Sequence, residues 1–168
     1  MIKHLRIGSL TALVAATAAL AVAPSALAEE RTCRGTLGAI TVDNLRVPQG
    51  ATCTLNGTRV KGTVKVERAA TLNATGIRVV GNVQAEGAAS VNLRASTVGG
   101  SIQVVQGRDS TLDRNTVKGD VQFFGNSGAI VITSNRIDAN LQCKENNPAP
   151  TGGGNIVQGN KEDQCARL

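Results

Sequence analysis

A short internal repeat constrains the fold of this chain more than any other feature of its sequence. One small-residue position recurs first at intervals of 19 and then at intervals of 20; its members are Gly62, Gly81, Gly100, Gly119, Ala139 and Gly159. The segments between them resemble one another, as GNVQAEGAASVNLRASTVG and GSIQVVQGRDSTLDRNTVK show. A nearly constant period over most of a chain indicates a solenoid in which each repeat stacks on the next.

Aligned at this period, the apolar residues fall into columns. The first pair of columns is Leu45, Val64, Val83, Ile102, Val121, Leu141 and, two residues later, Val47, Val66, Ala85, Val104, Phe123, Cys143. A second pair runs through Leu72/Ala74, Val91/Leu93, Ser110/Leu112 and Ile130/Ile132, and a single column through Val60, Val79, Val98, Val117, Ile137, Val157. A spacing of two is the period of a strand with one buried face. Three short strands per repeat predict an all-β, single-stranded, three-sided parallel β-helix of about six rungs. A β-sandwich would not keep like residues in columns.

The repeat also predicts where its own irregularities lie. One residue is added after Gly119, and we place it in the corner Gly125-Asn126-Ser127-Gly128, because a slip within a strand would turn core residues outward. Residues 144–154 depart further in composition, with the run Asn146-Asn147-Pro148-Ala149-Pro150. We expect a protruding loop or a cap segment there.

The N-terminus has the pattern of a cleaved secretory signal peptide. Lys3 and Arg6 precede an apolar run from Ile7 to Ala23, and Ala26-Leu27-Ala28 fits a cleavage site. We therefore assign residues 1–28 to the signal peptide and residues 29–168 to one β-helix domain. Removing the signal lowers the net charge from +6 to +4. The predicted location is periplasmic or extracellular, with no membrane insertion after cleavage.

The four cysteines all lie in the predicted mature chain. In an exported protein an even number indicates disulfides. The sequence separation is 20 between Cys33 and Cys53 and 22 between Cys143 and Cys165, so each pair is close to one repeat. We predict the disulfides Cys33–Cys53 and Cys143–Cys165, one at each end of the solenoid, where strand edges are open.

Two polar columns face outward or lie at a corner. The first is Arg46, Lys65, Gln84, Gln103, Gln122, Gln142. Stacked amides can hydrogen-bond along such a column. The column is therefore either a self-satisfied polar face or a recognition strip for a polymer with its own repeat. The second column, Asn115, Asn135, Asn155, is predicted to bond the backbone of the corners above and below it.

Basic residues form a second candidate surface. Arg59, Arg78 and Arg136 share one outward column, and Lys61 and Lys118 share another. This side either keeps the rod soluble or binds an anionic envelope polysaccharide. Arg94 and Asp113 lie one rung apart and are expected to form a weak surface ion pair. Nucleic acid is not expected, because the charge is small and the chain lacks stacking aromatics.

The composition excludes several kinds of active site. The predicted mature chain has no His, Trp or Tyr, which excludes a Ser-His-Asp triad, a His-ligated metal and an aromatic sugar platform built on Trp or Tyr. We expect no catalytic residue, metal or cofactor. Glu67 and Glu86 are the best remaining carboxylate pair, but rung stacking brings any such pair together, so their proximity carries little weight. Phe124 is the one aromatic expected to be exposed, whereas Phe123 is assigned to the core.

Several segments resemble right-handed parallel β-helix repeat proteins of the pectate-lyase-like superfamily. The resemblance rests on the segments RNTVKGDVQ, SNRIDANLQ and GNIVQGNKE, and it extends over about residues 41–165. VPQGATCTLNGT and NLQCKENNPAPTGGGNIVQGNKEDQC also resemble blocks found in small exported bacterial proteins. The resemblance implies a right-handed coil. It implies no activity for this chain, because the superfamily's lyases gather several acidic residues around calcium in a long groove.

Three functional hypotheses remain. The first is an exported, non-catalytic module of the bacterial envelope or extracellular space that is either structural or a binding module, with polysaccharide as its candidate ligand. The second is a polymer-forming scaffold in the manner of bactofilins. The capped ends and the polar C-terminal segment oppose it and favour a monomer. The third is a small polysaccharide-acting lyase or hydrolase.

Overall fold

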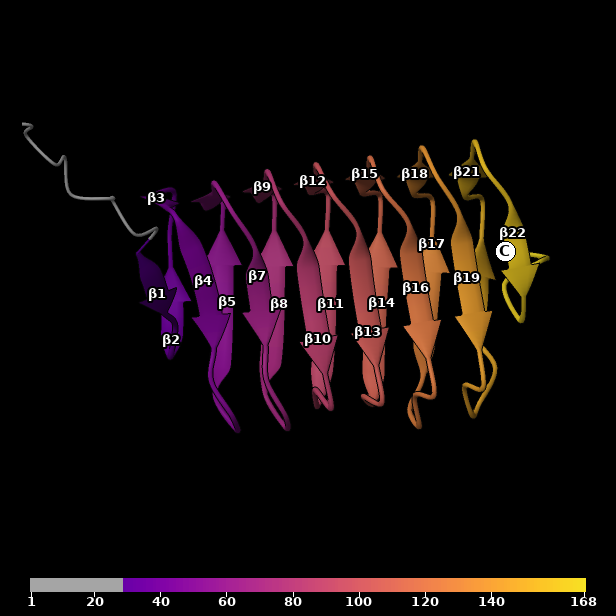
Figure 1. Cartoon of the computed structure of the whole chain (residues 1–168), viewed down its shortest axis with the longest axis horizontal. Helices are drawn as coiled ribbons and strands as arrows, with labels where there is room; N and C mark the ends of the chain where they lie inside the picture. The colour runs from indigo at the N-terminus through magenta and orange to yellow at the C-terminus, as the bar shows by residue number, and fades with distance from the viewer. Residues whose placement is uncertain (1–28) are drawn as a thin grey trace, which may run out of the picture.

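The computed structural model describes residues 29–168, which form an elongated all-β rod (Figure 1). The chain winds through three parallel sheets, two of seven strands and one of eight, so that it makes about seven turns. No helix occurs within the described residues, and consequently none that could cross a membrane. The predicted signal peptide, residues 1–28, lies outside the described part of the chain.

Each turn contributes one strand to each sheet. Sheet A contains β1 (Glu30–Thr32), β4 (Asn44–Val47), β7 (Val64–Val66), β10 (Val83–Glu86), β13 (Ile102–Val105), β16 (Val121–Phe124), β19 (Leu141–Lys144) and β22 (Lys161–Asp163). Sheet B contains β2 (Gly35–Leu37), β5 (Thr52–Asn56), β8 (Thr71–Thr75), β11 (Ser90–Arg94), β14 (Asp109–Asp113), β17 (Ile130–Thr133) and β20 (Thr151–Gly153). Sheet C contains β3 (Thr41–Val42), β6 (Arg59–Val60), β9 (Arg78–Val79), β12 (Thr97–Val98), β15 (Thr116–Val117), β18 (Arg136–Ile137) and β21 (Ile156–Val157).

The register of the strands confirms the predicted stacking. Val83 pairs with Val64 on one side and with Ile102 on the other, and these are its neighbours in the predicted column. The inward residues alternate with outward ones along every longer strand, and the inward columns fill the centre of the rod. Their large members, such as Leu45, Ile102 and Phe123, are almost completely buried. Most of the core therefore consists of the columns that the sequence identified, and Ala70, Ile77 and Ala88 add buried residues outside them.

The added residue lies at the predicted corner. Phe124 pairs with Val105 at a sequence offset of 19, whereas Ile130 pairs with Ser110 at an offset of 20. The extra residue must therefore fall between β16 and β17, which agrees with the corner 125–128.

The prediction of a protruding loop at 144–154 is wrong. Lys144 pairs with Phe124 and Gly153 with Thr133, so this segment keeps the period of the preceding turn and forms an ordinary corner followed by β20. Pro150 is buried at the position that Ile130 occupies one turn earlier. The composition changes there, but the path of the chain does not.

The structure has one turn more than the predicted six. Strands β1, β2 and β3 form an N-terminal turn that is shorter than the others, since Arg31 pairs with Leu45 at a sequence offset of only 14. Two residues, Cys33 and Arg34, join β1 to β2. The shortened corner removes the regular period from this turn, which is why the repeat did not reveal it.

Ladders of polar side chains hold the corners. At the corner between sheets B and C, Asn135 Oδ1 accepts hydrogen bonds from the backbone N–H of Asn115 (2.9 Å) and from its Nδ2 (3.0 Å). Asn135 Nδ2 donates to the carbonyl of Leu112 (2.9 Å), and Asn155 repeats the pattern one turn later. This confirms the predicted structural role of the asparagine column, because buried backbone groups need such partners.

A second ladder at the corner between sheets A and B was not predicted. Asn126, Asn146 and Gln164 stack on successive turns, and each of the first two donates its Nδ2 to a backbone carbonyl of the preceding turn. Gln164 closes the ladder by accepting from Asn146 N–H (2.9 Å). Asn126 and Asn146 each follow the recurring small residue by seven positions, whereas Gln164 follows it by five, so the sequence aligns only two members of this ladder.

The recurring glycine column lies at the corner between sheets C and A. A Cβ on Gly81 would lie 2.7 Å from the carbonyl oxygen of Gly62, and one on Gly100 would contact Asn82 Oδ1 even more closely. Successive turns approach each other here through backbone atoms. The repeat therefore needs a residue without a bulky side chain at this position.

Both predicted disulfides are present. Cys33–Cys53 joins the first turn to the second, and Cys143–Cys165 joins β19 to the segment after β22. Neither bridge links register partners, because Cys53 pairs in register with Gly35 and Cys143 with Asp163. Each bridge instead runs from the end of a sheet A strand to the neighbouring turn. Two disulfides indicate an oxidising compartment, such as the periplasm or the extracellular space.

Candidate functional site

The amide column is a continuous row on the outer face of sheet A. Gln84, Gln103, Gln122 and Gln142 occupy successive register positions. Gln103 Nε2 donates to Gln122 Oε1 (3.0 Å), and Gln122 Nε2 donates to Gln142 Oε1 (2.7 Å). Gln142 Nε2 then donates to the carboxylate of Glu162 (2.7 Å), so all the bonds run in one direction.

Each bonded glutamine keeps hydrogen-bonding capacity for a ligand. A primary amide has two N–H donors and two acceptor lone pairs, and the ladder uses one donor and one acceptor of Gln122. The side chain of Gln84 is exposed and makes no hydrogen bond within the described chain. The row is therefore partly self-satisfied and partly open, so it combines features of both interpretations of the column.

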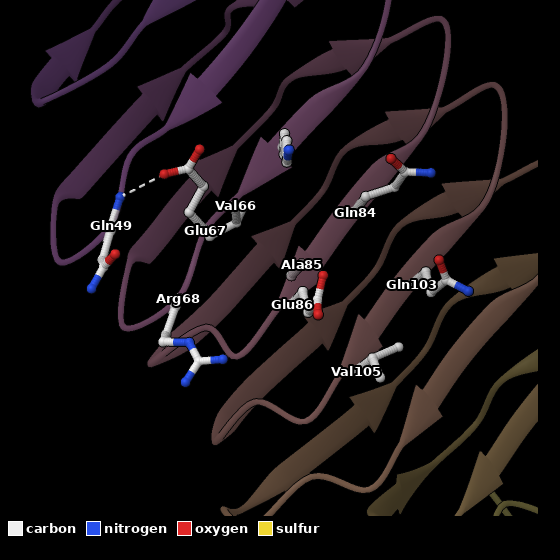
Figure 2. Close-up of a pocket in the computed structure, with 10 residues that line it drawn as sticks. Gln49, Val66, Glu67, Arg68, Gln84, Ala85, Glu86, Gln103 and Val105 are labelled. Carbon is white, nitrogen blue, oxygen red and sulfur yellow. Dashed lines mark hydrogen bonds between the residues drawn. The ribbon is translucent and has the colours of Figure 1, made fainter.

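An open hollow of about 560 Å³ lies beside the N-terminal half of this row (Figure 2). Gln84 and Gln103 form one side of it, and Glu67, Glu86 and Arg68 lie along the ends of the neighbouring strands. The hollow is a surface depression lined by amides and by charges of both signs. Such a surface offers donors and acceptors to a polar ligand that lies flat on the sheet.

Glu67 and Glu86 both line the hollow, as their predicted positions require, but Glu67 is already engaged. It accepts the backbone N–H of Gln49 (3.0 Å) and pairs with Arg46 (3.3 Å). The N–H of Gln49 and then the Arg46 guanidinium lower the pKa of Glu67 below its usual value. Glu67 is thus held as a carboxylate, which does not suit a general acid. Within residues 29–168 no three His, Cys, Asp or Glu side chains gather as a metal site.

The predicted arginine column lies on another part of the rod. Arg59 pairs with Arg78, and Arg136 follows after Thr97 and Thr116, all at the start of sheet C strands. The glutamine column and the arginine column are therefore two separate surfaces. The glutamines lie on sheet A, whereas the arginines lie at the corner between sheets B and C, which is the corner that does not border sheet A.

The predicted ion pair between Arg94 and Asp113 is wrong, although the two residues are register partners. Asp113 pairs instead with Arg114 (3.0 Å) and accepts a hydrogen bond from Thr133 (3.2 Å). This leaves Arg94 exposed and without a carboxylate partner within the described residues. Arg114 is adjacent to Asp113 in the chain and contacts its carboxylate through both Nε and Nη2.

The lysines of the basic side are neutralised locally. Lys61 pairs with Asp43 (2.9 Å) and Lys118 with Asp138 (2.7 Å), so each of these lysines contacts an aspartate of an adjacent turn. The hydrogen bond that each lysine donates, and then its positive charge, lower the pKa of Asp43 and of Asp138. The charge available to a ligand on this side therefore comes mainly from arginine.

The two phenylalanines lie where the alternation predicts. Phe123 is fully buried, and Phe124 faces outward on sheet A with partial exposure. Phe124 follows Val105 in register, so a small apolar patch borders the amide row.

No protein-family model, curated protein or solved structure matches the sequence. The structure shows a parallel β-solenoid with disulfides near its ends. The resemblance to the pectate-lyase-like superfamily thus agrees with the architecture, and membership in that superfamily stays a prediction.

Proposed function

We propose that this protein is exported and acts as a non-catalytic β-solenoid module that binds polysaccharide of the bacterial envelope or extracellular space. The observation that carries the proposal is the outer face of sheet A, where a row of stacked amides borders an open polar hollow. The signal-like N-terminus and the two disulfides support export.

The geometry suits a polymer better than a small molecule. Adjacent strands of a parallel sheet lie about 4.8 Å apart, so the amides present donors and acceptors at a fixed interval along the rod. A chain of sugars has hydroxyls at a regular interval as well. The hydrogen bonds between the glutamines hold the amide planes in place before a ligand arrives, which lowers the entropy lost on binding.

The amide row can be tested by replacing its central members with a side chain of similar length that cannot hydrogen-bond. We expect Gln103→Met together with Gln122→Met to weaken binding to purified cell-wall or capsular polysaccharide about tenfold, because each lost hydrogen bond contributes about 0.5–1.5 kcal/mol. Retention on the insoluble glycan, or calorimetry with a soluble one, measures the change.

The matched control is Thr54→Val together with Thr111→Val, which removes two hydroxyls from the outer face of sheet B. This variant should bind within about twofold of the native protein. Equal weakening by both variants, or no retention of the native protein on any envelope glycan, would contradict the proposal.

A further inference from the structure

A row of arginines follows one edge of the rod. We call it the arginine ridge, and it consists of Arg59, Arg78, Arg94, Arg114 and Arg136, one in each of five consecutive turns. All five are exposed and lie at the corner between sheets B and C. Where the strand of sheet C begins with threonine instead of arginine, as in β12 and β15, an arginine stands two or three residues earlier in the chain.

The replacements occupy the same edge because of how each turn bends. Arg94 is the last residue of β11 in sheet B, and Arg114 is the corner residue itself, with a φ of 54°. Arg59, Arg78 and Arg136 begin strands of sheet C immediately after that corner. Their long side chains can therefore reach the same edge from either side of the bend. With turns about 4.8 Å apart, the row extends ~19 Å parallel to the axis of the rod.

The ridge has few countercharges. Asp113 pairs with Arg114 (3.0 Å), and Asp138, which already pairs with Lys118, lies 3.7 Å from the Nε of Arg136. Arg59, Arg78 and Arg94 have no carboxylate within ion-pair distance in residues 29–168. Arg59 and Arg78 are direct register partners, an arrangement that destabilises a sheet when both residues carry the same charge. The folded chain thus holds a line of positive charge that its own stability does not require.

We propose that the arginine ridge is a second binding site, which holds a linear anionic glycan with its backbone parallel to the axis of the solenoid. A guanidinium presents two parallel N–H groups to a carboxylate or a phosphate, so either acidic group on successive repeat units fits it. No aromatic residue lies at this corner, so recognition there depends on charge and not on stacking against sugar rings. Because the site faces away from sheet A, it is separate from the surface described under the proposed function.

The test compares two triple variants of the full disulfide-bonded protein that lose the same charge. The first is Arg59→Gln, Arg78→Gln and Arg94→Gln on the ridge. The control is Arg34→Gln, Arg108→Gln and Arg167→Gln, three exposed arginines that belong neither to the ridge nor to the lining of the hollow. The probes are polygalacturonate, whose charges are carboxylates, and poly(N-acetylglucosamine 1-phosphate), a sugar polymer whose charges are phosphodiesters, and calorimetry at fixed salt measures both.

We expect the ridge variant to lose at least 30-fold in affinity for the polymer that binds, and the control to lose less than threefold. Affinity should rise with oligomer length up to about five charges and then level off. Binding to either probe alone supports the proposal and identifies the acidic group. Equal losses in the two triple variants, an affinity without a plateau in length, or no binding of either probe would overturn it.

The outcome is independent of the amide row on sheet A. Gln103→Met together with Gln122→Met should leave the affinity of the ridge for these probes unchanged. If that double variant abolished binding of the anionic probes while the ridge variant did not, the anionic polymer would occupy sheet A, and the ridge proposal alone would fail.

Discussion

Buried amide side chains connect successive corners of the solenoid. Substitutions of single residues can measure how much these amides contribute to the free energy of unfolding. Asn135 and Ser110 are both nearly inaccessible, with 1% and 2% of their surfaces exposed. Asn135 satisfies three polar groups of the turn before it, namely two N–H groups of Asn115 and the carbonyl of Leu112. The hydroxyl of Ser110, by contrast, has no hydrogen-bond partner in the described chain. The two positions therefore form a matched pair of buried polar side chains.

Asn135→Ala should lower the free energy of unfolding by about 2–4 kcal/mol, because it leaves several buried backbone and amide groups without partners. Ser110→Ala should change it by less than about 1 kcal/mol or raise it, since it removes a polar atom that is already unsatisfied. Urea denaturation measures both values. Similar losses in the two variants would show that the ladder adds nothing beyond the burial of side chains.

For the individual elements, the sequence alone was sufficient to predict the strands and the columns of residues that they bury. Alternation of inward and outward residues, as in Val83-Gln84-Ala85, is a local property that survives in the sequence. The added residue was also placed correctly, because a corner is the one place where a turn can lengthen without shifting its strands. The short first turn was missed, since an offset of 14 leaves no trace at a period of 19.

Column alignment could not find the arginine ridge. Arg94 and Arg114 stand three and two residues before Thr97 and Thr116, so an alignment by repeat position assigns them to other columns. Only the bend of the chain brings them to the edge that Arg59 and Arg78 occupy. The loop expected at 144–154 failed for the opposite reason. There the residue types change, while the chain keeps the path of the turn before it.

The two terminal disulfides should act on the turns that they join and not on the whole rod. Replacing Cys33 and Cys53 by Ala should lower the free energy of local unfolding of the first turns by about 3 kcal/mol, as expected for a closed loop with a sequence separation of 20. Hydrogen exchange should show that β1–β3 lose protection while β10–β14 keep theirs, because turns of a solenoid contact only their neighbours.

The matching control removes the other disulfide. Cys143→Ala with Cys165→Ala should expose β19–β22 to exchange and leave β1–β3 protected. If either variant lost protection evenly along the chain, the rod would unfold as one unit, and the ends would have no separate stability.

At the scale of the whole molecule, the two candidate surfaces lie on opposite sides of a narrow rod. Sheet A presents amides and a polar hollow, and the corner between sheets B and C presents the arginine ridge. A rod with two such surfaces can contact two polymer chains at once, and both contacts depend on the same stacking of turns. The arrangement of the sites is therefore a consequence of the repeat.

Distances along one outward column of sheet B test this stacking most directly. Thr36, Thr54, Val131 and Thr151 belong to a single column of register partners. Spin labels introduced there through an unnatural amino acid leave the disulfides intact. Double electron–electron resonance then measures the distances between pairs of labels. We predict ~19 Å for Thr54–Val131, ~24 Å for Thr54–Thr151 and ~29 Å for Thr36–Thr151, an increase of one strand spacing per turn. A Thr36–Thr151 distance no longer than the Thr54–Val131 distance would contradict the solenoid and every site derived from it.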